Sequence, residues 1–219
     1  MIPLLKKISI EINNSQYVKN LVVLSSGVGV SQLIPFLLLP ILTRFFSPQD
    51  FGFLALFMAI TQLLAISTTF RLEMAVLLPK KDSDAAIICI MSFFTLLLSS
   101  LFIIPALIFL IIHFNVLNDI KFEILNNSFQ ELHISFLYLI PCGVLLMGCY
   151  NILYSWNNRM ELYKNMSYSH VAHSLFSTPL AILFYYSPFK IIGLVLGQLI
   201  GRFLACFLSI YYGDPKNDA

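Results

Sequence analysis

Residues 20–43 read NLVVLSSGVGVSQLIPFLLLPILT, a run without a single charged side chain. A helix needs about 20 mostly apolar residues to cross the hydrocarbon core of a bilayer, so this run is long enough to span a membrane. Comparable stretches follow along the chain, and together they predict six spans, at about 20–43, 51–70, 85–114, 134–155, 167–186 and 191–212. The sequence therefore predicts an all-α, polytopic membrane helix bundle of six transmembrane helices, one lobe over residues 1–219.

The composition agrees with this class and gives no sign of a water-soluble domain. Hydrophobic residues make up 58% of the chain, charged residues 11%, and the mean hydropathy is +0.85, which leaves too few polar side chains to cover a globular surface. The net charge of +2 forms no dense basic patch, so nucleic-acid binding has no support. The four cysteines show no C-x-x-C spacing and are interpreted as small apolar residues.

The distribution of Lys and Arg predicts the orientation, because these residues are retained on the cytoplasmic side of membranes. Each span carries the chain across the membrane once, so successive loops emerge on alternating sides. One side then carries Lys6, Lys7, Lys19, Arg71, Lys80, Lys81, Arg159, Lys164 and Lys216, whereas the other carries only Arg44, Lys121 and Lys190. This bias places both termini in the cytoplasm.

Polar side chains recur at helical spacing inside the spans, where they cost insertion energy unless they face protein or water. The fifth span carries five of them on one face, namely His170, His173, Ser174, Ser177 and Thr178. In the first span, Gln32 shares a face with two small residues. These patterns predict a bundle around a partly hydrated cavity, and the alternative is that the hydroxyls bond back to their own helix carbonyls. No metal site is predicted, because two histidines without a nearby carboxylate are an incomplete ligand set.

The sixth span contains Gly193, Gly197 and Gly201, a repeated G-x-x-x-G pattern that lets another helix approach closely. Arg202 adjoins this face near the middle of the span. A bare arginine at that depth costs about 2.5–3.5 kcal/mol on insertion scales, so we expect Arg202 to find an anion or water.

Motifs of catalysis are missing from the sequence. It contains no G-x-S-x-G, no H-E-x-x-H and no phosphate-binding G-x-x-x-x-G-K pattern. We therefore predict no enzymatic activity, no catalytic residues and no cofactor.

Two segments carry a resemblance to a known family. Residues 42–52 contain Leu-Thr-Arg followed by Asp50-Phe51-Gly52, and residues 71–79 contain Arg71-x-Glu73-x-Ala and a closing proline. This ordered pair resembles the N-terminal half of Wzx-type polysaccharide and O-antigen flippases, and the likeness is strongest over residues 20–90. These proteins belong to the multidrug/oligosaccharidyl-lipid/polysaccharide exporter superfamily. The resemblance implies that this chain is one six-helix lobe of a two-lobed exporter, with the second lobe absent.

A flippase of this type moves an undecaprenyl-diphosphate-linked O-antigen or capsule repeat unit from the cytoplasmic to the periplasmic leaflet of the bacterial inner membrane. The implied partners are this lipid-linked oligosaccharide, membrane lipids, and a second lobe or polysaccharide-assembly proteins. The residues expected to bind the substrate are Arg71, Glu73, Arg202, Arg44, His170, His173, Gln32 and Ser174. Of these, the arginines are suited to phosphates, and the histidines, Ser174 and Gln32 to sugar hydroxyls.

Other interpretations stay open at this point. A cation-coupled drug or metabolite exporter of the same superfamily would use Glu73 or the histidines for coupling. An integral-membrane polysaccharide-assembly enzyme would need a large outward loop with paired carboxylates, and the longest outward loop here has about 20 residues. The chain ends soon after the sixth predicted span, so we expect a truncated gene product, a fragment, or a half-transporter that pairs with a second chain.

Overall fold

The computed structural model describes residues 16–117, 128–186 and 192–213, and all regular structure in these ranges is α-helical. This confirms the predicted all-α class. The helices are α2 (Gln16–Phe45), α3 (Pro48–Thr69), α4 (Leu72–Ala75), α5 (Asp82–Leu117), α6 (Ser128–Arg159), α7 (Tyr163–Tyr185) and α8 (Gly193–Tyr211).

Five stretches within these helices are long and apolar enough to cross a membrane: Val18–Phe45, Pro48–Thr69, Asp82–Ile103, Leu139–Arg159 and Gly193–Tyr211. Helix α7 has 23 residues and is long enough, but it is more polar and does not meet the same criterion. The membrane helix bundle is thus confirmed, and the predicted count of six spans is approximate because it depends on α7. Most serine and threonine side chains of α7 are buried against neighbouring helices, which spares them contact with lipid.

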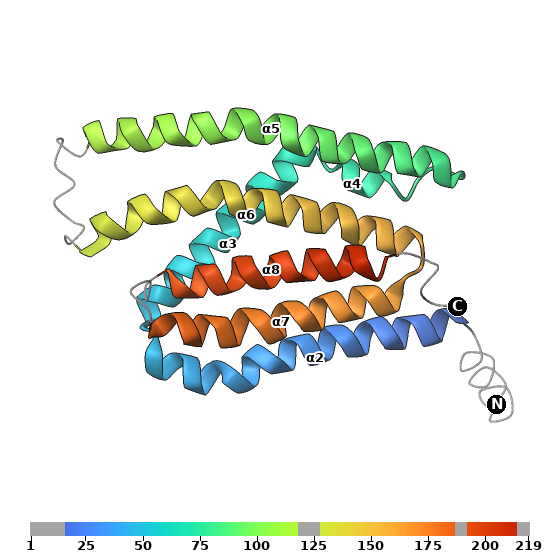
Figure 1. The fold of residues 1–219 in the computed structure, drawn as a ribbon, viewed down its shortest axis with the longest axis horizontal. Helices are drawn as coiled ribbons and strands as arrows, with labels where there is room; N and C mark the ends of the chain where they lie inside the picture. The colour runs from blue at the N-terminus through green and yellow to red at the C-terminus, as the bar shows by residue number, and fades with distance from the viewer. Residues whose placement is uncertain (1–15, 118–127, 187–191, 214–219) are drawn as a thin grey trace, which may run out of the picture.

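The long helices lie side by side in the order α2, α7, α8, α6 and α5, and α3 crosses behind them at an angle (Figure 1). Helix α7 packs most extensively against α8 and α2, while α6 contacts α8, α5 and α3. The start of α2, the short helix α4, the α6–α7 turn and the end of α8 all lie at one end of the bundle, which we call the α4 end (Figure 1).

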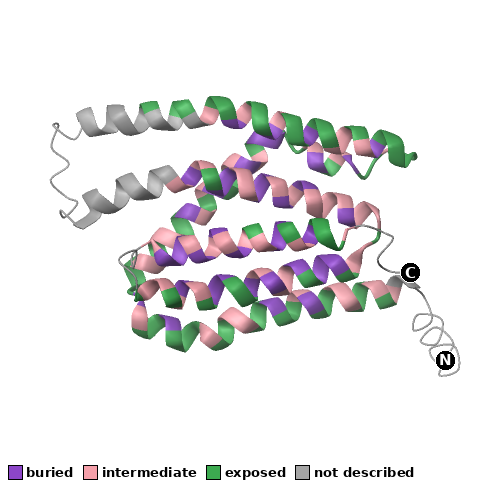
Figure 2. Ribbon diagram, viewed as in Figure 1, coloured by how far each residue is buried: buried purple, intermediate pink, exposed green. Residues whose placement is uncertain are grey.

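The core lies between the helices rather than at one centre, and Figure 2 shows the buried positions on the facing sides of neighbouring helices. One cluster joins α3, α6 and α8 through Phe57, Ile140, Val144, Val195 and Leu199. The outer faces expose large apolar side chains, for example Phe36 on α2 and Ile90 on α5, each 69% exposed. Such exposure is typical of a surface that contacts lipid tails.

The glycines of α8 allow a close contact with α7. A β-carbon at Gly197 would lie 2.5 Å from the Ser177 carbonyl oxygen, and one at Gly201 would lie 2.9 Å from the His173 carbonyl oxygen. The close approach predicted from the G-x-x-x-G pattern is therefore made with α7.

The connections at both ends of α3 have clear local causes. Ser47 caps the helix, its backbone N–H donates to the Asp50 carboxylate at 2.8 Å, and Pro48 occupies the first turn. At the other end, Phe70 and Arg71 both adopt left-handed conformations, with φ of 50° and 56°. These two residues end α3 and turn the chain into α4.

Candidate functional site

Arg202 lies at the midpoint of α8, facing helix α6. Its guanidinium carbon is 4.6 Å from the centroid of the Tyr150 ring, a cation–π contact. Among the described residues the one ion pair joins Arg159 to Asp82, so no described carboxylate neutralises Arg202. The arginine is therefore a partly buried cation that contacts the Tyr150 side chain and has no carboxylate partner in the described part of the chain.

A second side chain approaches the same tyrosine from α7. The Tyr150 hydroxyl is 3.5 Å from Nδ1 of His170, and the His170 ring is 5.6 Å from the Tyr154 ring. Three helices thus bring together one cation, two phenols and one imidazole. We call Arg202, Tyr150, Tyr154 and His170 the arginine cluster.

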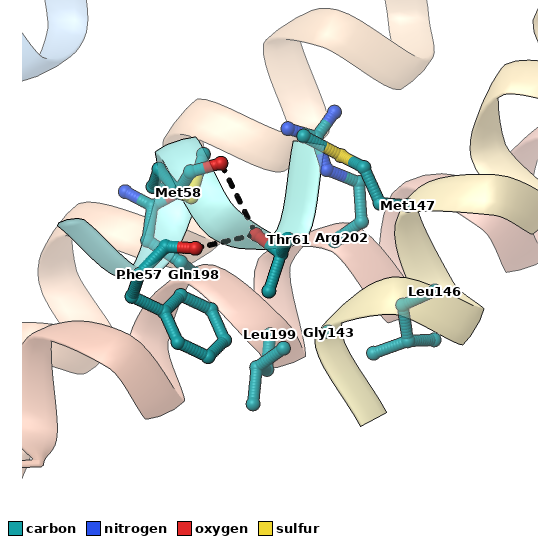
Figure 3. A pocket seen from close by; sticks show the side chains of 9 residues that line it. All are labelled: Phe57, Met58, Thr61, Gly143, Leu146, Met147, Gln198, Leu199 and Arg202. Atoms are coloured by element: carbon teal, nitrogen blue, oxygen red, sulfur yellow. Dashed lines mark hydrogen bonds between the residues drawn. The ribbon is translucent and has the colours of Figure 1, made fainter. Parts of the chain in front are cut away.

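A small cavity lies beside the cluster. Its volume is about 20 Å³, and Arg202, Gln198 and Thr61 are its polar lining residues (Figure 3). The Thr61 hydroxyl donates to the Phe57 carbonyl at 2.7 Å, so its hydrogen bond stays within α3. The cavity has room for about one water molecule and is far too small for a sugar. This cavity therefore does not admit an oligosaccharide.

The polar face of α7 is divided between two neighbours. His170 joins the arginine cluster, whereas Ser177 packs against Gly197 and Gly201 of α8. Thr178 is buried as well. The Ser174 hydroxyl donates to the His170 carbonyl at 3.3 Å, which is the backbone bonding considered as the alternative. His173 lies beside Gly201, and its buried Nε2 has no hydrogen-bond partner among the described residues.

The other predicted site residues lie away from the arginine cluster. Gln32 and Arg44 are exposed on α2, and Arg44 is at the end of the bundle opposite α4. Arg71 is exposed, and its Nη1 is 3.6 Å from the Met74 sulfur. Glu73 is buried, with an exposed fraction of 6%, and its Oε2 has no partner within the described ranges. Arg71 and Glu73 thus have separate surroundings, as their i, i+2 spacing predicts.

Sequence reasoning missed Tyr150 and Tyr154, which form the α6 side of the arginine cluster. Their i, i+4 spacing, which puts both on one face of a helix, is the local signal that could have indicated them. It also missed Arg159, whose guanidinium donates to the Val76 carbonyl at 3.0 Å and to the Asp82 carboxylate at 2.9 Å. This arginine ties the end of α6 to the link between α4 and α5. Its partners are about 80 residues away in sequence, so no local pattern could reveal them.

A third missed group fixes the α6–α7 turn to α8. The Asn157 amide donates to the Ser209 hydroxyl at 2.7 Å, and the Asn165 amide donates to the Ser209 carbonyl at 3.0 Å. All three residues are buried. Buried polar groups are costly unless they are paired, so this network sets how α7 and α8 meet the end of α6.

Comparisons with known proteins give one match. No curated protein and no solved structure matches the chain. The model of the family described as "Polysaccharide biosynthesis protein" matches residues 17–214, which covers α2 to α8. This agrees with the resemblance seen in the two segments near α3, because that family includes Wzx-type flippases. The chain is therefore a polysaccharide-related membrane protein and belongs to the polysaccharide biosynthesis protein family.

Proposed function

We propose that this chain is a lobe of a flippase that carries an undecaprenyl-diphosphate-linked O-antigen or capsule repeat unit across the bacterial inner membrane. The proposed activity is transport, in which no bond is made or broken. Family membership and the apolar helices support a role in moving polysaccharide precursors through lipid. A diphosphate and a sugar cannot cross hydrocarbon unaided and need cations and hydrogen-bonding groups along their path.

The observation that carries this proposal is that no carboxylate of the described residues forms an ion pair with Arg202. An arginine at the centre of a span costs about 2.5–3.5 kcal/mol on insertion scales. The cation–π contact with Tyr150 returns about 0.5–2 kcal/mol, so the cost is only partly offset. An anion that entered between α6 and α8 would offset the rest. We infer that the diphosphate of the lipid-linked oligosaccharide is that anion.

The proposed direction of transport rests on the charges at the two ends of the bundle. Among the described residues, the α4 end carries Lys19, Arg71, Lys80, Lys81, Arg159 and Lys164, and the opposite end carries only Arg44. The positive-inside rule assigns the α4 end to the cytoplasm. The substrate would then enter at the α4 end and leave toward Arg44.

One observation favours a second candidate, a cation-coupled exporter of the same superfamily. Glu73 is buried at the α4 end with one carboxylate oxygen unpartnered in the described residues. A buried, unpaired carboxylate is suited to binding a cation or a proton. This candidate predicts transport that depends on a sodium or proton gradient and is abolished by Glu73→Gln.

The test is a flipping assay with the purified chain in liposomes that contain a fluorescent undecaprenyl-diphosphate oligosaccharide. A membrane-impermeant glycosidase outside the vesicles measures how much substrate reaches the outer leaflet. We expect cleavage to proceed beyond the half that is initially exposed, and Arg202→Met to stop at that half, as protein-free vesicles do. Cleavage that stops at half with the wild-type chain would overturn the proposal.

A further inference from the structure

A groove separates α2 and α7 on their outer side, away from the arginine cluster. Its volume is about 220 Å³, and its lining includes Val23, Gly27 and Val30 of α2 together with Lys164 and Val171 of α7. His170 and His173 project from other faces of α7, about a third and about half of a turn away from Val171 and Lys164. The groove is therefore separate from the site proposed for the oligosaccharide.

The floor of the groove is fixed by a direct contact between the two helices. The Ser167 hydroxyl donates to the Val23 carbonyl at 2.8 Å, and Gly27 faces the same serine without room for a side chain. Farther along, Leu42 packs with Ala181, so α2 and α7 run in the same direction. Residues one turn before Val23 and one turn before Ser167 consequently lie at the same end of the groove.

Those residues are lysines. Lys164 lines the mouth of the groove, and Lys19 is exposed one turn before Val23 on the same face of α2. Neither lysine forms an ion pair with a carboxylate in the described part of the chain. The groove thus has an apolar floor and, at one end, two lysines that pair with no described carboxylate.

A group of tyrosines places this mouth at the level of the lipid headgroups. Tyr168 also lines the groove, and its ring is 6.1 Å from that of Tyr212, which in turn is 5.2 Å from Tyr211. All three rings are exposed. Exposed tyrosines on membrane helices gather at the interface between lipid and water. The valines of the groove then lie one to three turns deeper, beside the acyl chains.

We propose that the α2–α7 groove binds an anionic phospholipid of the leaflet at the α4 end. Its phosphate lies between Lys19 and Lys164, and one acyl chain lies along Val23, Val30 and Val171. The groove faces the surrounding bilayer, so a bulk lipid reaches it without any opening of the bundle. The two lysines select an anionic headgroup by charge. Each lysine close to an anionic lipid contributes about 1 kcal/mol, which favours that lipid over a neutral one by about fivefold.

The test is native mass spectrometry of the purified full chain with phosphatidylglycerol and phosphatidylcholine of identical acyl chains. We expect the first bound phosphatidylglycerol to be retained about 25-fold more strongly than phosphatidylcholine, and the double variant K19Q/K164Q to lose this preference. The matched control is K80Q/K81Q, which removes two exposed lysines at the same end but outside the groove and should keep the preference.

Three results would overturn the lipid site. These are equal retention of the two lipids by the wild-type chain, an unchanged preference in K19Q/K164Q, and tighter retention of undecaprenyl diphosphate than of phosphatidylglycerol by Arg202→Met, whose arginine cluster lacks its cation. The last result would identify the groove as a carrier-lipid site instead. A second variant tests the groove without changing its charge. Ser26 is exposed and lines the groove, so the larger side chain of Ser26→Phe should fill it and reduce retention of both phospholipids. The assay does not depend on transport, so it separates this site from the proposed flippase activity.

Discussion

Replacing Arg202 by methionine should strengthen the fold and weaken substrate binding at the same time. Methionine keeps much of the side-chain volume and removes the charge. The insertion cost of about 2.5–3.5 kcal/mol is then regained, and the cation–π contact of about 0.5–2 kcal/mol with Tyr150 is lost. The free energy of unfolding should therefore rise by about 0.5–3 kcal/mol.

Binding should change in the opposite direction. Hydrogen bonds to charged groups contribute about 1.5–3 kcal/mol, so loss of the guanidinium should weaken binding of an undecaprenyl-diphosphate oligosaccharide about 10- to 150-fold. Arg202→Lys keeps the charge but not the planar group, and it should fall between the wild-type chain and Arg202→Met. Phe203→Ala is the matched control, because Phe203 is the next residue on α8 and is 58% exposed.

Two measurements on the same purified proteins test both expected effects of Arg202→Met. Unfolding in mixed micelles gives the free energy of unfolding, and a titration with fluorescent lipid-linked oligosaccharide gives the dissociation constant. A lower free energy of unfolding in Arg202→Met, together with substrate binding as tight as in the wild-type chain, would refute both expectations. Arg202 would then be a structural element of the α6–α8 contact rather than a ligand for the diphosphate.

Further predictions concern the helix contacts. Gly197→Leu should lower the free energy of unfolding in mixed micelles by about 1–3 kcal/mol, because its β-carbon would meet an α7 carbonyl at 2.5 Å. Gly29→Ala, which has open space around it, should instead raise that free energy by up to about 1 kcal/mol. Asn157→Ala leaves the buried Ser209 hydroxyl without its partner and should cost about 1–3 kcal/mol in the same assay, so no change would refute this role. Arg159→Gln frees the link between α4 and α5, and limited proteolysis should cut that link faster than in the wild-type chain.

Features that depend on neighbours in sequence could be predicted well. The Ser47 cap follows from the pattern Ser-Pro-x-Asp, and the tight contact of Gly197 and Gly201 follows from their spacing. Both depend on backbone groups within a few residues or on side-chain size alone. The shared face of His170 and Ser174 on α7 could likewise be predicted, because residues four apart lie on one face of a helix.

Which neighbour each helix face packs against could not be predicted in the same way. Lipid tails and protein cores are equally apolar, so a hydrophobic pattern does not tell which side of a membrane helix faces inward. Gln32 proved to be exposed, whereas Ser177 packs against α8. The contact between Tyr150 and Arg202 joins α6 to α8, and the packing of these two helices depends on the whole bundle. It could therefore not be predicted from residues that are close in sequence. The polarity of α7 also shows why counting apolar stretches gives an approximate number of spans.

The central claim is that the arginine cluster binds the diphosphate of a lipid-linked oligosaccharide inside the bundle. The most direct measurement is photo-crosslinking of the full chain with an undecaprenyl-diphosphate oligosaccharide that carries a diazirine on its first sugar, followed by mapping of the labelled peptides. If the diphosphate binds there, labels are expected on the segments around Tyr150 and Arg202, and Arg202→Met should lose them. Labels confined to lipid-exposed residues such as Phe36 and Ile90, unchanged in that variant, would contradict the central claim.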